Sequence, residues 1–205
     1  MNSTDHKAIL QHYLGIQRTV FLTKLEGLSE RQARTPITGT GTNILGVVKH
    51  AVGVECGYLS DVFGRPSQVE TPWYAEDAED NDDMWATAEQ DIPWMLDFCE
   101  QVWAQSDATI AALDLDAPGQ VPWWREGEVT LHLILVHVIA EYARHAGHLD
   151  IARELLDGQI GWKQESPVLP DWESRRWAEY VDRLKELAEA SSAEPVSRPA
   201  RADGV

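Results

Sequence analysis

One segment, residues 129–157, constrains the fold more than any other part of the chain. It reads as a single helix that ends at Gly158. Its first part, residues 131–140, is apolar nearly all round, which is typical of a helix buried inside a protein. Four ionisable residues nevertheless follow one helix face at i, i+4, i+8 and i+11: His137, Glu141, His145 and His148. Burying such groups is costly unless they are paired or bind a cation, so the segment indicates a metal site in a helical core.

Four further segments have apolar residues at helical spacing: residues 5–27, 43–63, 88–113 and 172–190. Thr42 or Asn43 is expected to cap the second of them, and Thr87 to Gln90 matches a capping box that would open the third. Pro93 is expected to kink or restart that helix. No alternating strand pattern of any length is present.

The predicted fold is therefore all-α: a four-helix bundle with a long crossover between its second and third helices, plus a C-terminal accessory helix. The crossover corresponds to residues 64–87. We expect the bundle to occupy residues 1–160. Residues 161–190 would hold the accessory helix, packed on the bundle, and the Ser-, Ala-, Pro- and Arg-rich residues 191–205 would form a disordered tail.

The net charge of −17 argues against nucleic-acid binding and against an anionic membrane surface, because both need a basic patch. The charge is uneven, since residues 66–124 contain fourteen acids and no Lys, Arg or His. The acidic run 76–83 is interpreted as a solvated loop. With no signal-peptide pattern and no apolar run of membrane-spanning length, we expect a cytoplasmic protein, in which Cys56 and Cys99 are buried reduced thiols.

A metal site needs ligands from more than one helix. Glu141 and His145 are four residues apart, so both can reach one ion, and the third ligand must come from another helix. His50 is the best candidate, because it lies mid-helix among apolar residues. Three protein ligands would leave a position open for water or substrate, as in catalytic zinc sites. His137 and His148 are expected to orient the ligands or to be hydrogen-bonded core residues.

Four other residues are candidates for lining the site. Tyr58 lies on the same part of its helix as His50 and could line a pocket, and Arg144 could bind an anion. Trp123 and Trp124, in the loop before the last long helix, could roof the site. Alternatively they are a lid on the hydrophobic core.

Two motifs carry a resemblance to a known family. The first is Asn43-Ile-Leu-Gly-Val-Val-Lys-His50 followed by Glu55; the second runs from Leu135 to Asp150 and is followed by Arg153-Glu-Leu. Together they resemble the DinB-like (YfiT-like) superfamily of metal-binding four-helix bundles over residues 5–158. Many members carry histidine where this chain has Glu141; mycothiol-dependent maleylpyruvate isomerase is similar to this chain in its His, Glu, His set.

The resemblance implies a divalent metal bound by His50, Glu141 and His145, with zinc as first candidate and nickel or iron as alternatives. It also implies a low-molecular-weight thiol co-substrate of the mycothiol or bacillithiol type. The expected function is a metal-dependent thiol S-transferase that detoxifies small electrophiles, acting as a homodimer. The alternative is a non-enzymatic, stress-related metal-binding bundle that works through dimerisation or a partner.

Overall fold

The computed structural model describes residues 4–161 and 169–191. The chain divides into two compact units, residues 1–168 and 169–205. The elements of the first unit are α1 (His6–Leu25), α2 (Glu30–Arg34), α3 (Ile44–Tyr58), the 3-10 helices η1 (Asp61–Phe63), η2 (Pro72–Tyr74) and η3 (Asp82–Met84), α4 (Ile92–Ala112), β1 (Pro118–Gln120), β2 (Glu128–Thr130) and α5 (Leu131–Asp157). The second unit contains α6 (Ser174–Ala190).

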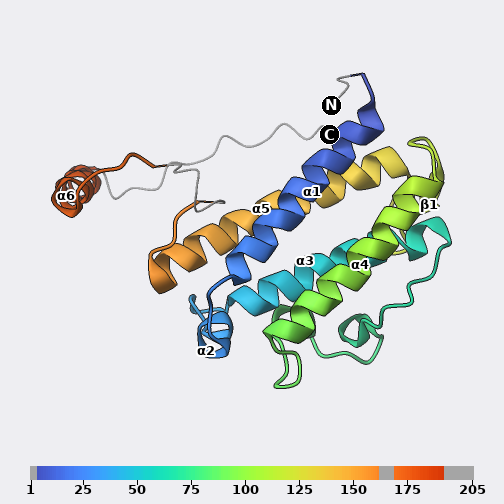
Figure 1. The fold of residues 1–205 in the computed structure, drawn as a ribbon, viewed down its shortest axis with the longest axis horizontal. Helices are drawn as coiled ribbons and strands as arrows, with labels where there is room; N and C mark the ends of the chain where they lie inside the picture. Colours follow the sequence, from blue (N-terminus) through green and yellow to red (C-terminus); the bar gives the residue numbers. More distant parts are fainter. Residues whose placement is uncertain (1–3, 162–168, 192–205) are drawn as a thin grey trace. The chain divides into compact units, whose positions relative to one another are not determined.

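The long helices of the first unit pack around one hydrophobic core. Helix α1 packs against α5, and α3 contacts α1, α4 and α5 (Figure 1). Fully buried side chains include Phe21 of α1, Leu45 of α3, Met95 of α4 and Leu135 of α5. The described chain is mostly helical, which confirms the predicted class, and this packing is compatible with a helical bundle.

Side-chain caps explain where most of these helices begin. The side chains of Asp5, Asn43 and Thr130 accept hydrogen bonds from the first turns of α1, α3 and α5. The predicted start of α4 at residue 88 is wrong. Asp91 caps this helix and Pro93 occupies its first turn, where proline needs no hydrogen-bond donor, so no kink results.

A short antiparallel hairpin was not anticipated from the sequence. Strands β1 and β2 pair Gly119 with Val129, just before α5 begins. Each strand has three residues, which is too short to produce a recognisable alternating pattern.

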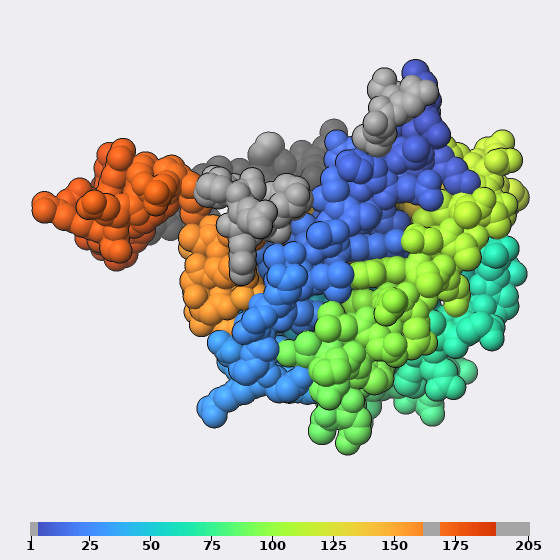
Figure 2. Space-filling model, viewed as in Figure 1, coloured from blue at the N-terminus to red at the C-terminus, as the bar shows by residue number. Residues whose placement is uncertain are grey.

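A buried polar network links the long helices. Arg18 of α1 forms a salt bridge with Glu55 of α3, whose side chain is fully buried, and a second one with Asp107 of α4. Tyr142 of α5 donates a hydrogen bond to Glu55, with 2.7 Å between the oxygens. Helices α1 and α4, coloured blue and green, form neighbouring parts of the surface in Figure 2.

The described part of the second unit, residues 169–191, contains one amphipathic helix with an aromatic cluster at its start. The rings of Trp172, Trp177 and Tyr180 lie against one another. Glu173 occupies the N-cap position of α6. The predicted disordered tail lies almost entirely outside the described residues. Within the described ranges, no helix has the length and apolar character needed to cross a membrane.

Candidate metal and substrate site

Helices α3 and α5 bring the three predicted ligands together. His50 of α3 and Glu141 and His145 of α5 each offer one ligand atom, and these atoms lie within 4.8 Å of one another. Glu141 Oε2 is 3.5 Å from His145 Nε2, as the i, i+4 spacing predicts. The ring centres of His50 and His145 are 4.7 Å apart. His145 is buried, whereas His50 and Glu141 are partly exposed, so the cluster has one open side.

His145 is held in its neutral form. Burial, together with the neighbouring His50 and His148, lowers the pKa of His145 to about 4, although Glu141 acts in the opposite direction. The Nδ1 atoms of His145 and His148 are 3.3 Å apart. A neutral imidazole is the form that binds a metal ion, so the chain prepares this ligand at neutral pH.

The acidic crossover contributes a residue that sequence reasoning missed. Asp83 Oδ2 lies 2.6 Å from Nδ1 of His50, and the hydroxyl of Tyr74 donates to the backbone carbonyl of His50 at 3.2 Å. A carboxylate that accepts from one ring nitrogen of a histidine orients the other nitrogen towards a metal. The interpretation of residues 76–83 as only a solvated loop is therefore wrong at Asp83.

Close packing against α3 holds this part of the crossover in place. Lys49 Nζ donates hydrogen bonds to the carbonyl oxygens of Asp82 and Trp85, at 2.9 and 2.8 Å, and lies 4.2 Å from the ring centre of Trp73. A Cβ atom on Gly46 would be only 1.8 Å from the carbonyl oxygen of Met84. The glycine therefore permits a backbone contact that a larger residue would block.

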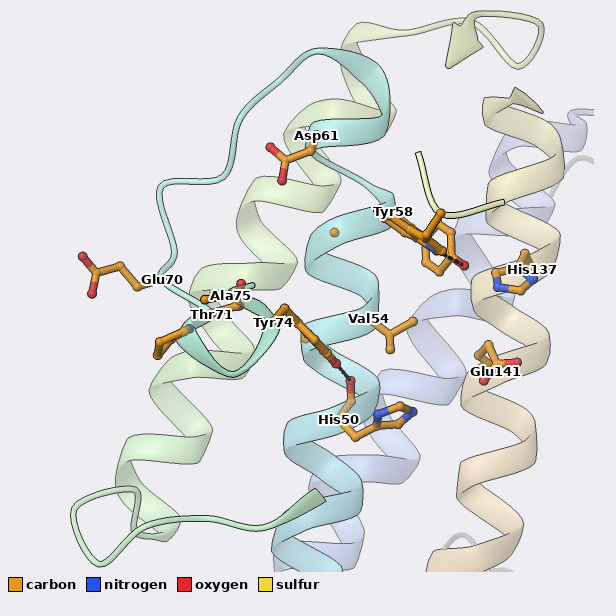
Figure 3. A pocket seen from close by; sticks show the side chains of 14 residues that line it. His50, Val54, Tyr58, Asp61, Glu70, Thr71, Tyr74, Ala75, His137 and Glu141 are labelled. Atoms are coloured by element: carbon orange, nitrogen blue, oxygen red, sulfur yellow. Dashed lines mark hydrogen bonds between the residues drawn. The ribbon is translucent and has the colours of Figure 1, made fainter. Parts of the chain in front are cut away.

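A pocket of about 1000 Å³ opens beside the cluster. His50 lies on its α3 wall and His137 and Glu141 on its α5 side, as Figure 3 shows. Tyr74 lines it from the crossover. Two of the three ligand candidates, His50 and Glu141, therefore face a space large enough for a small organic molecule, whereas His145 is buried beside them.

A family model described as mycothiol S-transferase matches residues 9–158. The chain belongs to the mycothiol S-transferase family. The matched range contains the three ligand candidates and Asp83, and membership is consistent with the DinB-like resemblance of the two motifs. It supports a thiol-related transferase role and a thiol co-substrate. No curated protein matches the chain.

The aromatic residues expected near the site form one cluster in this mycothiol S-transferase family member. Trp123 and Trp124 both donate hydrogen bonds from Nε1 to the hydroxyl of Tyr58, at 3.3 and 3.0 Å. The centre of the His137 ring lies 4.8 Å from the ring centre of Tyr58 and 5.0 Å from that of Trp124. Tyr58, Trp123 and His137 line the pocket, and Trp124 packs behind them against the core.

The remaining candidates lie outside the pocket lining. Arg144 is exposed, and His148 is exposed beside His145. Glu55, which follows the first motif, pairs with Arg18 in the core. Asp61 and Glu70 are further pocket-lining residues that the sequence did not single out, because Asp61 is a polar residue at the end of the segment 43–63 and neither residue belongs to a motif.

Proposed function

We propose that this protein is a metal-dependent thiol S-transferase that joins a mycothiol-type thiol to a small electrophile. One observation carries the proposal: two imidazoles and one carboxylate converge within 4.8 Å beside a pocket, in a chain of the mycothiol S-transferase family. Charged or ionisable groups gathered in this way between helices need either pairing or a cation.

The donor set fits a divalent ion. Two histidines and one glutamate are found in catalytic zinc sites, and two histidines with a carboxylate also suit non-haem iron. Zinc is our first candidate, with nickel and iron as alternatives. When bound, such an ion lowers the pKa of a nearby thiol and so favours the nucleophilic thiolate at neutral pH.

The chain's own residues would then bind and orient the reactants. Asp83 would hold His50 in one ring orientation, and burial would keep His145 neutral. The aromatic side chains of Tyr58 and Trp123 would exclude water from one wall of the pocket and provide an apolar surface for the electrophile.

Metal analysis of purified variants tests the ligand assignment. We expect the wild-type protein to carry close to one equivalent of a divalent metal, and His50→Ala and His145→Ala to lose it. His132→Ala is the matched control, because His132 is exposed on the same helix as His145. Full metal occupancy in both ligand variants would show that the assignment is wrong.

Thiol consumption tests the activity. The metal-loaded protein would be incubated with mycothiol and a panel of model electrophiles, and the loss of free thiol compared with that of a chelator-treated sample. We expect faster loss only with the metal-loaded protein. Equal rates across the whole panel would contradict the enzyme proposal and favour a non-enzymatic metal-binding protein.

A further inference from the structure

The carboxylates in the pocket lining are not matched there by any lysine or arginine among the described residues. Asp61 of η1 and Glu70 of the crossover are exposed lining residues, with the Glu70 carboxylate directed away from the other labelled side chains, and Glu141 lies on the α5 side (Figure 3). None of the described residues that line the pocket is a lysine or an arginine. The rest of the lining is neutral or aromatic, including Tyr58, Tyr74 and Trp123.

The cations that are near the lining in sequence do not offset these carboxylates. The Lys49 ammonium is directed into the crossover by its hydrogen bonds to Asp82 and Trp85. Arg65 donates a hydrogen bond to the Thr109 hydroxyl at 3.2 Å. Arg144, and Arg125 two residues after Trp123, are exposed and do not line the pocket.

A bound metal would not reverse the sign. The two positive charges of a divalent ion would be balanced by the Glu141 carboxylate and by the sulfur of an ionised thiol. Asp61 and Glu70 would then remain as net negative charge on the side of the pocket away from the ligand cluster. Both residues are exposed, so their field acts on a charged reactant as it enters the pocket and is weakened by salt.

We propose that this pocket selects electrophiles by charge: it accepts uncharged and cationic electrophiles and rejects anionic ones. This inference rests on the proposed S-transferase function and adds the substrate class. The aromatic side chains favour the same choice, because the faces of Tyr58, Tyr74 and Trp123 attract cations and repel anions.

Three N-substituted maleimides undergo the same reaction with a thiol, and the charge of the substituent differs from one compound to the next. The thiolate sulfur forms a bond to one alkene carbon, the π-electron pair moves to the neighbouring carbon, and that carbon takes a proton from water. No leaving group or oxidant is involved. N-ethylmaleimide is neutral, N-(2-carboxyethyl)maleimide is anionic and N-[2-(trimethylammonio)ethyl]maleimide is cationic at neutral pH.

The test compares kcat/KM for the three maleimides with mycothiol, each divided by its uncatalysed rate constant. We expect the anionic compound to be used about tenfold less efficiently than the neutral one, and the cationic compound at least as efficiently. Equal normalised values for the anionic and neutral compounds would overturn the inference. If no maleimide reacts faster than without protein, the proposed function fails, and the quenching experiment below still decides the charge question.

A double substitution with a matched control distinguishes the effect of the pocket carboxylates from the effect of the protein's net charge. Asp61→Asn/Glu70→Gln removes two pocket carboxylates, whereas Glu100→Gln/Glu154→Gln removes two exposed carboxylates of α4 and α5 that do not line it. We expect the first pair to bring the anionic and neutral rates together and the second to leave their ratio unchanged. An equal effect of both pairs would assign the discrimination to net charge and overturn the inference.

Collisional quenching reads the same field without metal or thiol. Trp123 lines the pocket, so the difference between the fluorescence of the wild-type protein and that of Trp123→Phe reports on it. Each quenching constant is divided by that of the same ion for free tryptophan. We expect this ratio to be larger for caesium than for iodide, and the difference to shrink in Asp61→Asn/Glu70→Gln. Equal accessibility to both ions in the wild-type protein would contradict a negative pocket.

Discussion

The Oδ2 atom of Asp83 lies 2.6 Å from Nδ1 of His50, although the two residues belong to different elements and are 33 positions apart. Asp83 is in η3, within the acidic crossover, and His50 is in the middle of α3. The carboxylate contacts His50, the one ligand candidate that is not on α5. The crossover is thus part of the candidate metal site as well as a connection between helices.

Asp83→Asn should weaken metal binding while leaving the fold intact. An amide is a poorer acceptor for the His50 ring, so ring orientation and ligand basicity are both reduced, and loss of such a partner typically costs about 10- to 100-fold in metal affinity. Competition with a chelator of known affinity measures this. Asp82→Asn is the control, because it removes the same charge from the neighbouring residue, whose carboxylate accepts a hydrogen bond from Nε1 of Trp85. Equal affinities of the two variants would contradict an orienting role for Asp83.

The metal-free protein should lose stability as the pH falls from about 6.5 to about 4. In this range an unfolded His145 takes up a proton, whereas the folded one, with a pKa of about 4, does not. Since the unfolded state then binds more protons, the free energy of unfolding decreases, by about 3 kcal/mol at the lower end. Urea unfolding at several pH values measures the slope. We expect His145→Gln to flatten it; an unchanged slope would show that other groups cause it.

The two cysteines should be unreactive in the native protein. Burial, and secondarily Glu55, raises the pKa of Cys99 to about 12, and burial also raises that of Cys56. For Cys99 this lowers the thiolate fraction at neutral pH by about a thousandfold. Titration with a chromogenic disulfide reagent should therefore detect both thiols only after unfolding in guanidinium. Rapid native reaction would contradict their burial and would complicate any assay of thiol consumption.

Loss of the buried carboxylate at Glu55 should destabilise the protein strongly. Glu55→Ala leaves Arg18 and the hydroxyl of Tyr142 without their partner in the core, and breaking a buried pair in this way costs about 3–5 kcal/mol. Asp107→Asn is the comparison, because Asp107 is exposed and its bond to the same arginine is worth about 1 kcal/mol or less. Chemical denaturation measures both, and similar losses for the two variants would contradict the prediction.

Local sequence was sufficient for the helices and for the ligand candidates on them. Glu141 and His145 share one face because the spacing of four residues is a property of the helix itself, and the cap at Asn43 fixes where α3 begins. Where a local rule competed with another, prediction failed: Thr87 matched a capping box, but Asp91 followed by Pro93 offered a better start for α4.

The crossover shows what the sequence left open. Residues 59–91 contain short 3-10 turns with no sustained periodicity, so nothing local indicates which of their carboxylates turns inwards. Trp73 and Trp85, on either side of the acidic run 76–83, were the sequence signal that this segment packs on the bundle. Their contacts with Lys49 hold it on α3. Asp83 reaches His50 only because that contact has formed.

The sequence by itself determined that this chain is helical and that two of its helices carry the histidines and the glutamate of a candidate metal site, because helix spacing and capping act over a few residues. Only the tertiary structure decided that His50 meets Glu141 and His145, that Asp83 orients it, and that Asp61 and Glu70 make the pocket beside it acidic. These relations join segments distant in the chain, and they depend on how the core and the crossover pack, which no local pattern encodes.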